Sequence, residues 1–492
     1  MNFQTYMKNF FTQAAPALAL LGLALGGCQV DITEPQASAG GADFSRYIAV
    51  GNSLTAGYSD NGLYLEGQQN SYPSILAQQF AQVGGGAFVQ PLFPAANSNG
   101  SGYLRLNGFD ATGNPIIVPV AANGAVGLGL DGRTPLLVRY AGTDNQNLGV
   151  PGIRMSDVNT PGYGLNNPIG FNPYFERLLP AGTPTSYLGY VKERVATIKP
   201  TFFTEWLGNN DVLGYATAGG GANSITPTAT FSANTGQVLD ALTSGGAKGV
   251  VATIPDVTGI PFFTTVGPAF RNVLAAGNVP GAAPFVYTTG LLAPGQPNTR
   301  VASTLGNIRD AAGSGNLLLT LTASPYVSLY GRPTGKYWRD FYQQARPSLP
   351  PTVPNLSVFL LLLQVDTTKA FGQSTANPFP STLVLDPTEQ AAVVSATTTF
   401  NGILTSAANA RNLAVFDANA FFTQIARNGV VINGVSNTAS FITGNLFGLD
   451  GVHPTPRGYA LVANEMIRTI NSKYGASVPG VDATAYRGVK FP

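Results

Sequence analysis

Short apolar runs recur along this chain and predict the strands of a buried sheet. The runs lie at residues 46–50, 201–207, 249–254 and 413–417, and each is rich in aromatic or aliphatic side chains. Runs of this length that lead into glycine, proline or asparagine turns are typical of strands buried on both faces. They therefore indicate a core of parallel β-strands.

Segments with helical periodicity alternate with these runs. Tyr187, Val191, Val195 and Ile198 are spaced by four, four and three residues, and Pro200 ends the pattern. Further helices are predicted after Asn70-Ser71-Tyr72-Pro73, around Val238 and Leu242, from Asp386 to about Ala410, and from Thr455-Pro456 to Tyr474, with Gly475 as the stop. Alternating strands and helices predict a parallel sheet covered on both faces, a three-layer α/β/α arrangement.

Two stretches interrupt this alternation. Residues from about 81 to 135 are rich in glycine and contain two β-favouring runs around a turn, which predicts a β-hairpin, and the core is expected to resume near Leu136–Tyr140. From 256 to about 381 the alternation of predicted strands and helices is lost again. The apolar run at 358–363 there predicts a buried strand or helix in a cap, and it could also line an apolar acyl pocket.

Composition limits the class of protein. The chain has 492 residues, 44% of them hydrophobic, enough for one large elaborated domain or for two to three ordinary ones. Only 10% are charged, and the formal net charge of +2 leaves no basic surplus for binding phosphate backbones. Nucleic acid is therefore not expected as a partner.

The N-terminal segment has the pattern of a targeting signal. Lys8 is followed by an apolar run from Ala14 to Leu25, too short to span a bilayer, and then by Gly26-Gly27-Cys28. Small residues before a cysteine resemble the lipobox of bacterial lipoproteins. This resemblance implies a cleaved signal at 1–27, acylation of Cys28 and, because Gln29 is not Asp, an outer-membrane destination. An ordinary secretory signal is the alternative.

The cysteine count adds a further limit. Cys28 is the only cysteine, so disulfides within the chain and a zinc thiolate cluster are excluded. Residues 28–42, which are rich in Ala, Ser and Gly toward their end, are expected to form a flexible tether.

Polar side chains with chemical potential follow the predicted strands. His453 is the only histidine and lies three residues after Asp450, which can orient the imidazole and stabilise its charged form. Ser53 follows the first strand in a glycine-flanked turn, and Asn210 follows the strand at 201–207. Gly152 lies in a turn whose N–H could bind an anion. Taken singly, each of these residues is equally typical of an ordinary turn.

Taken together in this order, they resemble the SGNH hydrolases, also called the GDSL esterase/lipase superfamily. The matching blocks are Gly51-Asn52-Ser53-Leu54, Asn147-Leu148-Gly149-Val150-Pro151-Gly152, Gly208-Asn209-Asn210-Asp211 and Asp450-Gly451-Val452-His453-Pro454. The resemblance implies a flavodoxin-like SGNH hydrolase domain over residues 43–475. The stretches at about 81–135 and 256–381 fall outside the resemblance and are interpreted as insertions, the second a candidate cap. Residues 476–492 have no periodicity and are expected to form a C-terminal tail that packs along the surface or stays loose.

The resemblance also implies a role for each block. Ser53 would be the nucleophile, His453 its general base and then acid, and Asp450 the residue that orients His453. The oxyanion would be bound by the backbone N–H groups of Ser53 and Gly152 and by the Asn210 side chain, with neither metal nor cofactor. Asn52 departs from the family pattern, which normally has Asp before the nucleophile, and this departure bears on the rate or the pH optimum.

The expected function is hydrolysis of carboxylic esters through an acyl-enzyme, by a lipoprotein anchored in the cell envelope outside the cytoplasm. Lipid, aryl or acylated-glycan esters are all candidate substrates, and oligomeric state is left open. The alternative is a noncatalytic lipoprotein that binds a glycan or lipid on a hydrolase scaffold. A metallohydrolase is disfavoured by the single histidine, and insensitivity to chelators would exclude it.

Overall fold

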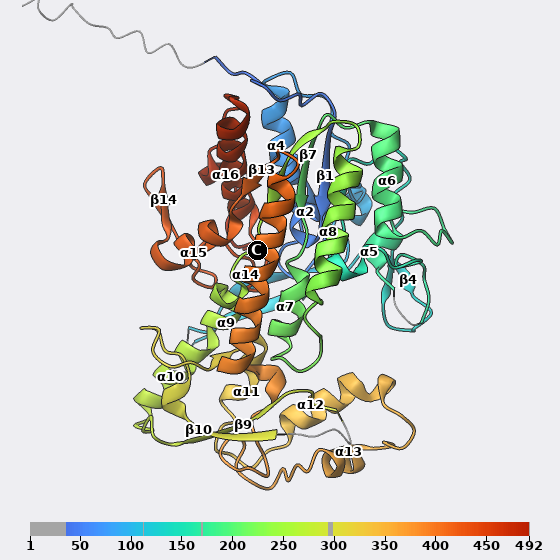
Figure 1. The fold of residues 1–492 in the computed structure, drawn as a ribbon. Coiled ribbons are helices and arrows are strands. Elements are labelled where there is room, and N and C mark those ends of the chain that lie inside the picture. The colour runs from blue at the N-terminus through green and yellow to red at the C-terminus, as the bar shows by residue number, and fades with distance from the viewer. Residues whose placement is uncertain (1–35, 112, 169–170, 294–298, 492) are drawn as a thin grey trace, which may run out of the picture.

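A five-stranded parallel sheet forms the centre of the molecule in the computed structural model, which describes residues 36–491 apart from 112, 169–170 and 294–298 (Figure 1). Its strands, in spatial order, are β13 (Ala414–Phe416), β8 (Lys248–Ala252), β7 (Phe202–Trp206), β1 (Tyr47–Gly51) and β6 (Asn147–Gly149). All four pairings are parallel. The α/β class predicted from the alternating pattern is therefore confirmed.

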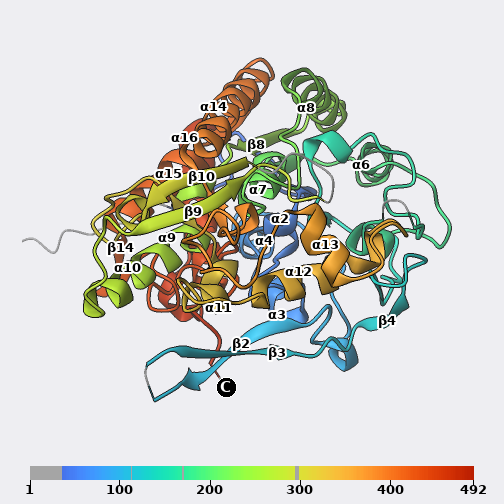
Figure 2. The same ribbon diagram turned by 90° about the horizontal axis from the view of Figure 1, so that it is seen from below.

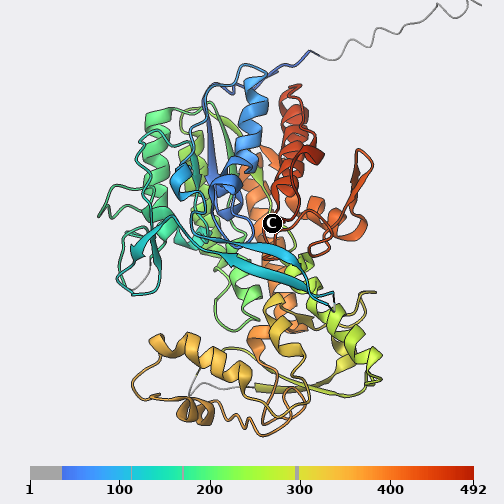
Figure 3. The ribbon, with the colours of Figure 1, turned by 180° about the vertical axis from the view of Figure 1, so that it is seen from behind.

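Helices cover both faces of this sheet, as a three-layer α/β/α arrangement requires (Figures 1 and 3). On one face α4 (Tyr72–Ala81) and α16 (Pro456–Tyr474) both pack on Phe202, through Phe80 and Tyr474. The other face carries α6 (Tyr187–Ile198), α8 (Thr228–Thr243) and α14 (Pro387–Asn409). Phe231 of α8 stacks on Phe400 of α14 with 3.9 Å between ring centroids.

Shorter helices and hairpins surround this core. They are α2 (Ser53–Ala56), α3 (Leu65–Gln69), α5 (Pro173–Glu176), α7 (Asn210–Thr217), α15 (Ala418–Asn428) and three antiparallel pairs: β2 (Tyr103–Phe109) with β3 (Pro115–Val120), β4 (Ala125–Leu128) with β5 (Pro135–Leu137), and β14 (Val430–Ile432) with β15 (Val435–Asn437). The hairpin predicted within 81–135 is the β2–β3 pair. The expectation that the core resumes near Leu136–Tyr140 holds for Tyr140, which packs against the main core. It is wrong for Leu136 and Leu137, because β5 pairs with β4, and Leu137 packs in a small separate cluster with Leu63 and Phe93.

Residues 261–385 form a second body, below the sheet in Figure 1 and nearest the viewer in Figure 2. We call it the lower body. Most of its buried apolar side chains make a hydrophobic core of their own, whereas Phe262, Phe263, Leu318 and Leu385 join the core of the sheet. Its elements are α9 (Pro261–Thr264), α10 (Val266–Ala276), β9 (Pro284–Thr289), β10 (Thr299–Thr304), β11 (Leu318–Leu319), α11 (Ser324–Val327), α12 (Lys336–Ala345), α13 (Leu356–Leu362) and β12 (Val384–Leu385). The buried Trp338, Phe359 and Phe379 belong to its core. The lower body lies at the carboxyl ends of the central strands.

The apolar run at 358–363 differs from its prediction. It lies largely in α13, a helix whose Leu361 is 74% exposed and whose Leu362 is 40% exposed, while Phe359 and Leu363 are buried. The helix carries only part of its apolar surface into the lower-body core, because one face of a surface helix points to solvent. The expectation of a buried strand or helix is therefore met by a helix that is buried at Phe359 and is wrong for the exposed Leu361 and Leu362.

Both ends of the described chain pack against the core. Residues 36–42 were expected to be part of a flexible tether, but Gly41 donates to the carbonyl of Tyr474, and Ser477 donates to the carbonyls of Gln36 and Ser38. In the C-terminal tail, Val478, Ala483 and Val489 are buried. The expected signal at 1–27 and Cys28 lie outside the described residues. Within the described part of the chain, no helix has both the length and the apolar character needed to cross a bilayer.

Candidate active site

The turn after β1 fixes the position of Ser53. Gly51 ends the strand, and a side chain at this position would lie 2.0 Å from Thr55 Oγ1 and 2.8 Å from the Trp206 carbonyl oxygen. The turn is closed by Asn52, whose Oδ1 accepts from the N–H of Leu54 at 3.0 Å. Ser53 then opens α2 with its side chain at the carboxyl end of the sheet, as the strand–turn–helix pattern predicts.

His453 lies beside that hydroxyl, although 400 residues separate the two in sequence. Its Nε2 is 2.9 Å from Ser53 Oγ, and its Nδ1 is 2.8 Å from Asp450 Oδ2. The ring also packs against Tyr58, with 4.6 Å between centroids, which limits its rotation. The three side chains form a continuous relay in which His453 can accept the serine proton at Nε2 while Asp450 accepts a hydrogen bond from the Nδ1–H group.

Asp450 is held in its charged form. Its Oδ1 accepts from the backbone N–H groups of Val452 and His453, and its Oδ2 accepts from the N–H of Asn61 at 2.8 Å. Burial alone would raise the pKa of Asp450, but the neighbouring imidazole and the hydrogen bonds from residues 452 and 453 lower it below its usual value. This carboxylate is therefore suited to stabilise a positively charged imidazole.

A short segment after α2 holds the histidine loop in place. Ser59 Oγ donates to the Pro454 carbonyl at 2.9 Å, and Asp60 Oδ1 accepts from the N–H of Leu449 at 2.9 Å. Asp60 is fully buried, and burial raises its pKa, although Arg487 of the C-terminal tail opposes that shift. Sequence reasoning missed this role of Ser59, Asp60 and Asn61, because only the fold brings these residues to the histidine loop.

Gly152 and Asn210 approach from the two loops beside β1. Asn210 opens α7, and its Nδ2 donates to the Ile153 carbonyl at 2.9 Å, which leaves this amide a second hydrogen to donate. Asp211 ties the same loops together by accepting from the N–H groups of Met155 and Ser156. Burial raises the pKa of Asp211 to about 6. Sequence analysis assigned Asp211 no role, although it lies in the Gly-x-Asn-Asp block.

All five side chains and turns predicted for this site line one cleft. Ser53, Gly152, Asn210, Asp450 and His453 border a hollow of about 650 Å³, to which the lower body also contributes Phe262 and Leu321. A narrow second hollow of about 50 Å³ leads away from Ser53 and His453 on the side of Phe422 and Phe447. The apolar run at 358–363, considered as a lining for an acyl pocket, borders neither hollow.

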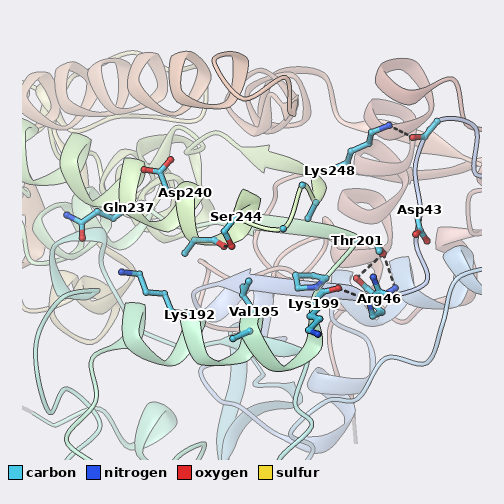
Figure 4. A pocket seen from close by; sticks show the side chains of 17 residues that line it. Asp43, Arg46, Lys192, Val195, Lys199, Thr201, Gln237, Asp240, Ser244 and Lys248 are labelled. Carbon is cyan, nitrogen blue, oxygen red and sulfur yellow. Dashed lines mark hydrogen bonds between the residues drawn. The ribbon is translucent and has the colours of Figure 1, made fainter.

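A larger hollow lies elsewhere in the described part of the chain. It measures about 1010 Å³ and is found near the amino ends of β7 and β8, where Thr201, Lys248 and Arg46 surround it (Figure 4). Lys192, Lys199 and Asp240 lie along its walls, but the relay of Ser53, His453 and Asp450 does not. Volume alone would thus point away from the relay of Ser53, His453 and Asp450.

One buried acid near this site belongs to neither hollow. Glu205 lies in β7 beside β1, its Oε1 accepts from the N–H of Leu207, and burial raises its pKa to about 8. Its Oε2 and the Nδ2 of Asn52 have no hydrogen-bond partner among the described residues. At neutral pH, Glu205 is therefore largely protonated.

The described residues contain no group of three or more His, Cys, Asp or Glu side chains arranged to hold a metal ion. Comparison of the chain with protein-family models and with curated proteins finds no match. The geometry of the site is therefore the basis for inferring its chemistry.

Proposed function

We propose that this chain is a serine esterase of the SGNH hydrolase superfamily that hydrolyses carboxylic esters through an acyl-enzyme. The observation that carries the proposal is the relay from Ser53 through His453 to Asp450, with contacts of 2.9 and 2.8 Å. A serine hydroxyl becomes an effective nucleophile when an oriented imidazole can take its proton. Each member of the relay matches the role implied by the sequence resemblance.

The first half-reaction transfers the acyl group to Ser53. Oγ attacks the ester carbonyl carbon while its proton passes to Nε2 of His453, and Asp450 stabilises the resulting imidazolium. The tetrahedral intermediate then collapses, its bond to the alcohol oxygen breaks, and the alcohol leaves with the proton from Nε2. In the second half-reaction, water attacks the acyl-serine while His453 takes its proton. The bond from the acyl carbon to Ser53 Oγ then breaks, Oγ regains the proton from Nε2, and the carboxylic acid is released.

The negative oxygen of the intermediate is assigned to the side of the cleft that carries Gly152 and Asn210. Its donors would be the backbone N–H groups of Ser53 and Gly152 and the second N–H of the Asn210 amide. Such donors act strongly because they are already oriented before the charge develops. Support comes from the position of all three residues on the same cleft beside His453.

The finer description of the fold belongs to the same proposal. Numbered along the chain, the central strands lie in the order 2-1-3-4-5, which is the flavodoxin-like order, and Ser53 follows the first strand at the switch point. We assign the peripheral hairpins within 81–135 and the lower body as insertions into this framework. The lower body then acts as a cap beside the cleft.

The cellular address rests on the N-terminal sequence. The proposal places the enzyme in the cell envelope, outside the cytoplasm, with a lipid on Cys28 that attaches it to the outer membrane. The composition of the Leu25-Gly26-Gly27-Cys28 motif supports this address.

The deciding experiment compares Ser53→Ala with Ser244→Ala, which changes an exposed serine in the distant hollow. Ester hydrolysis and labelling by a fluorophosphonate probe should disappear in Ser53→Ala and persist in Ser244→Ala. If Ser53→Ala keeps full activity or full labelling, the mechanism is wrong. If the unmodified protein turns over no ester at all, the noncatalytic alternative takes its place.

A further inference from the structure

Two hollows meet at the reactive hydroxyl. Ser53, Asn210, Leu213, Val452 and His453 border both the narrow pocket and the broad cleft. An ester whose carbonyl carbon lies on Ser53 Oγ has two arms, the acyl chain and the alcohol. Each hollow can therefore take one arm, and their different sizes set which esters fit.

The narrow pocket is small and apolar. It measures about 50 Å³, and its walls include Leu213, Val257, Ile260, Phe422 and Phe447. An apolar cavity of about 150 Å³ holds benzene with its six carbons, so about one third of that volume holds two to three carbons. Val257, Ile260 and Phe447 are each less than a tenth exposed, so surrounding atoms hold these walls in place.

The broad cleft is more than ten times larger. It measures about 650 Å³, within the range of sites for drug-sized ligands. Its walls combine aromatic rings with polar groups: Tyr58 and Tyr174 face it from the sheet side, and Phe262, Leu321 and Thr322 from the lower body. A bulky alcohol fits here, and only here.

Resting on the esterase function proposed above, we infer that the narrow pocket binds the acyl chain and the broad cleft binds the alcohol. The substrate class is then a short-chain ester, acetyl to butyryl, of a bulky alcohol. The assignment follows from the order of events, since the acyl group stays on Ser53 after the alcohol has left. A confined pocket holds that group in place, while the vacated cleft admits the attacking water.

Phe422 and Phe447 set the depth of the acyl pocket. Together with Ile260, they also line a neighbouring hollow of about 810 Å³ that contains Asp256 and Arg427. These side chains therefore form a wall between the acyl pocket and a large space. Removing the half-buried ring of Phe422 should join the two volumes and make room for a longer chain.

The test measures kcat/KM for nitrophenyl acetate, butyrate and octanoate with the mature protein. For the unmodified enzyme, we expect a fall of at least about tenfold from butyrate to octanoate. In Phe422→Ala, the octanoate-to-acetate ratio should rise by at least about tenfold. Phe441→Ala is the matched control, because this half-buried ring lines the neighbouring hollow but not the acyl pocket, so the ratio should not change.

Three results would overturn the inference while leaving the esterase function intact. They are octanoate hydrolysis as fast as that of acetate in the unmodified enzyme, an unchanged ratio in Phe422→Ala, and a preference for methyl esters of long-chain acids over aryl acetates. The last result would reverse the assignment of the two hollows. Absence of turnover on every ester, together with absence of fluorophosphonate labelling, would instead contradict the esterase function itself.

Discussion

Substitution of Asn210 by alanine separates a chemical role of this side chain from a structural one. The Asn210 amide donates one hydrogen to the carbonyl of Ile153, in the loop that carries Gly152, and its other hydrogen is available to the cleft. Asn234 offers a matched comparison, because its Nδ2 donates at 2.8 Å to the carbonyl of Met155 in the same loop. Asn234 lies in α8 and borders neither hollow of the site.

The expected magnitudes differ for the two variants. Asn210→Ala loses one hydrogen bond to the loop, which costs about 1 kcal/mol of the free energy of unfolding. Asn234→Ala loses two hydrogen bonds, because its Oδ1 also accepts from Asn159 Nδ2 at 2.8 Å, and it should be destabilised at least as much. Only Asn210→Ala also loses the donor that we propose for the oxyanion, so it should raise the reaction barrier by about 3 kcal/mol and lower kcat by about 10²- to 10³-fold. Asn234→Ala should keep kcat within about threefold of the unmodified enzyme.

The assay combines steady-state hydrolysis of nitrophenyl acetate with urea unfolding of both variants. Support requires a loss of stability in Asn234→Ala at least as large as in Asn210→Ala, together with a large fall in kcat for Asn210→Ala alone and little change in KM. Equal falls in kcat would mean that Asn210 acts only by holding the Gly152 loop. The oxyanion assignment would then have to exclude this side chain.

Three further predictions concern two buried acids near the site and the dependence of the activity on metal ions. Asp60→Ala removes the acceptor of the Leu449 N–H and of the Tyr64 hydroxyl, so the free energy of unfolding should fall by at least about 2 kcal/mol. A change below about 0.5 kcal/mol in urea unfolding would contradict the role of Asp60 in holding the histidine loop. Because burial raises the pKa of Glu205 from 4.5 to about 8, the folded state holds this proton more tightly than the unfolded state, and the free energy of unfolding should fall as pH rises between these values. Glu205→Gln should flatten that decline. An equal decline from pH 5 to pH 8 in the variant and the unmodified protein would refute the assignment. Treatment with EDTA should leave ester hydrolysis unchanged, since the described residues offer no group of three metal-binding side chains, and a loss restored by added zinc would favour a metallohydrolase.

The sequence predicted those features that local patterns determine. The capping box of Asp386 and Glu389, the Thr455 cap with Pro456, and the Gly475 stop all occur where expected, because caps depend on neighbouring residues. The position of Ser53 after a buried strand followed from the same kind of local signal. For parallel strands, such signals also place side chains at a common edge of the sheet.

The features that sequence reasoning missed depend on contacts between distant parts of the chain. Residues 36–42 are held by backbone hydrogen bonds to residues 474–477, which no local sequence pattern predicts. The exposure of Leu361 depends on which face of α13 meets the lower body. The separation of the site into a narrow and a broad hollow likewise depends on how Phe262, Leu321 and Phe422 approach it from three separate segments.

The contact between Ser53 and His453 is supported by hydrogen bonds that hold the distant histidine loop beside the serine. A displacement of about 1 Å in a reacting group can cost about 10²-fold in rate, so a loop 400 residues away needs to be tied to the serine itself. Ser59, Asp60 and Asn61 supply three hydrogen bonds to the histidine loop, and they follow directly on the helix that begins with Ser53. Because one short segment carries both the hydroxyl and these bonds, a shift of α2 moves the imidazole with it and preserves the 2.9 Å contact.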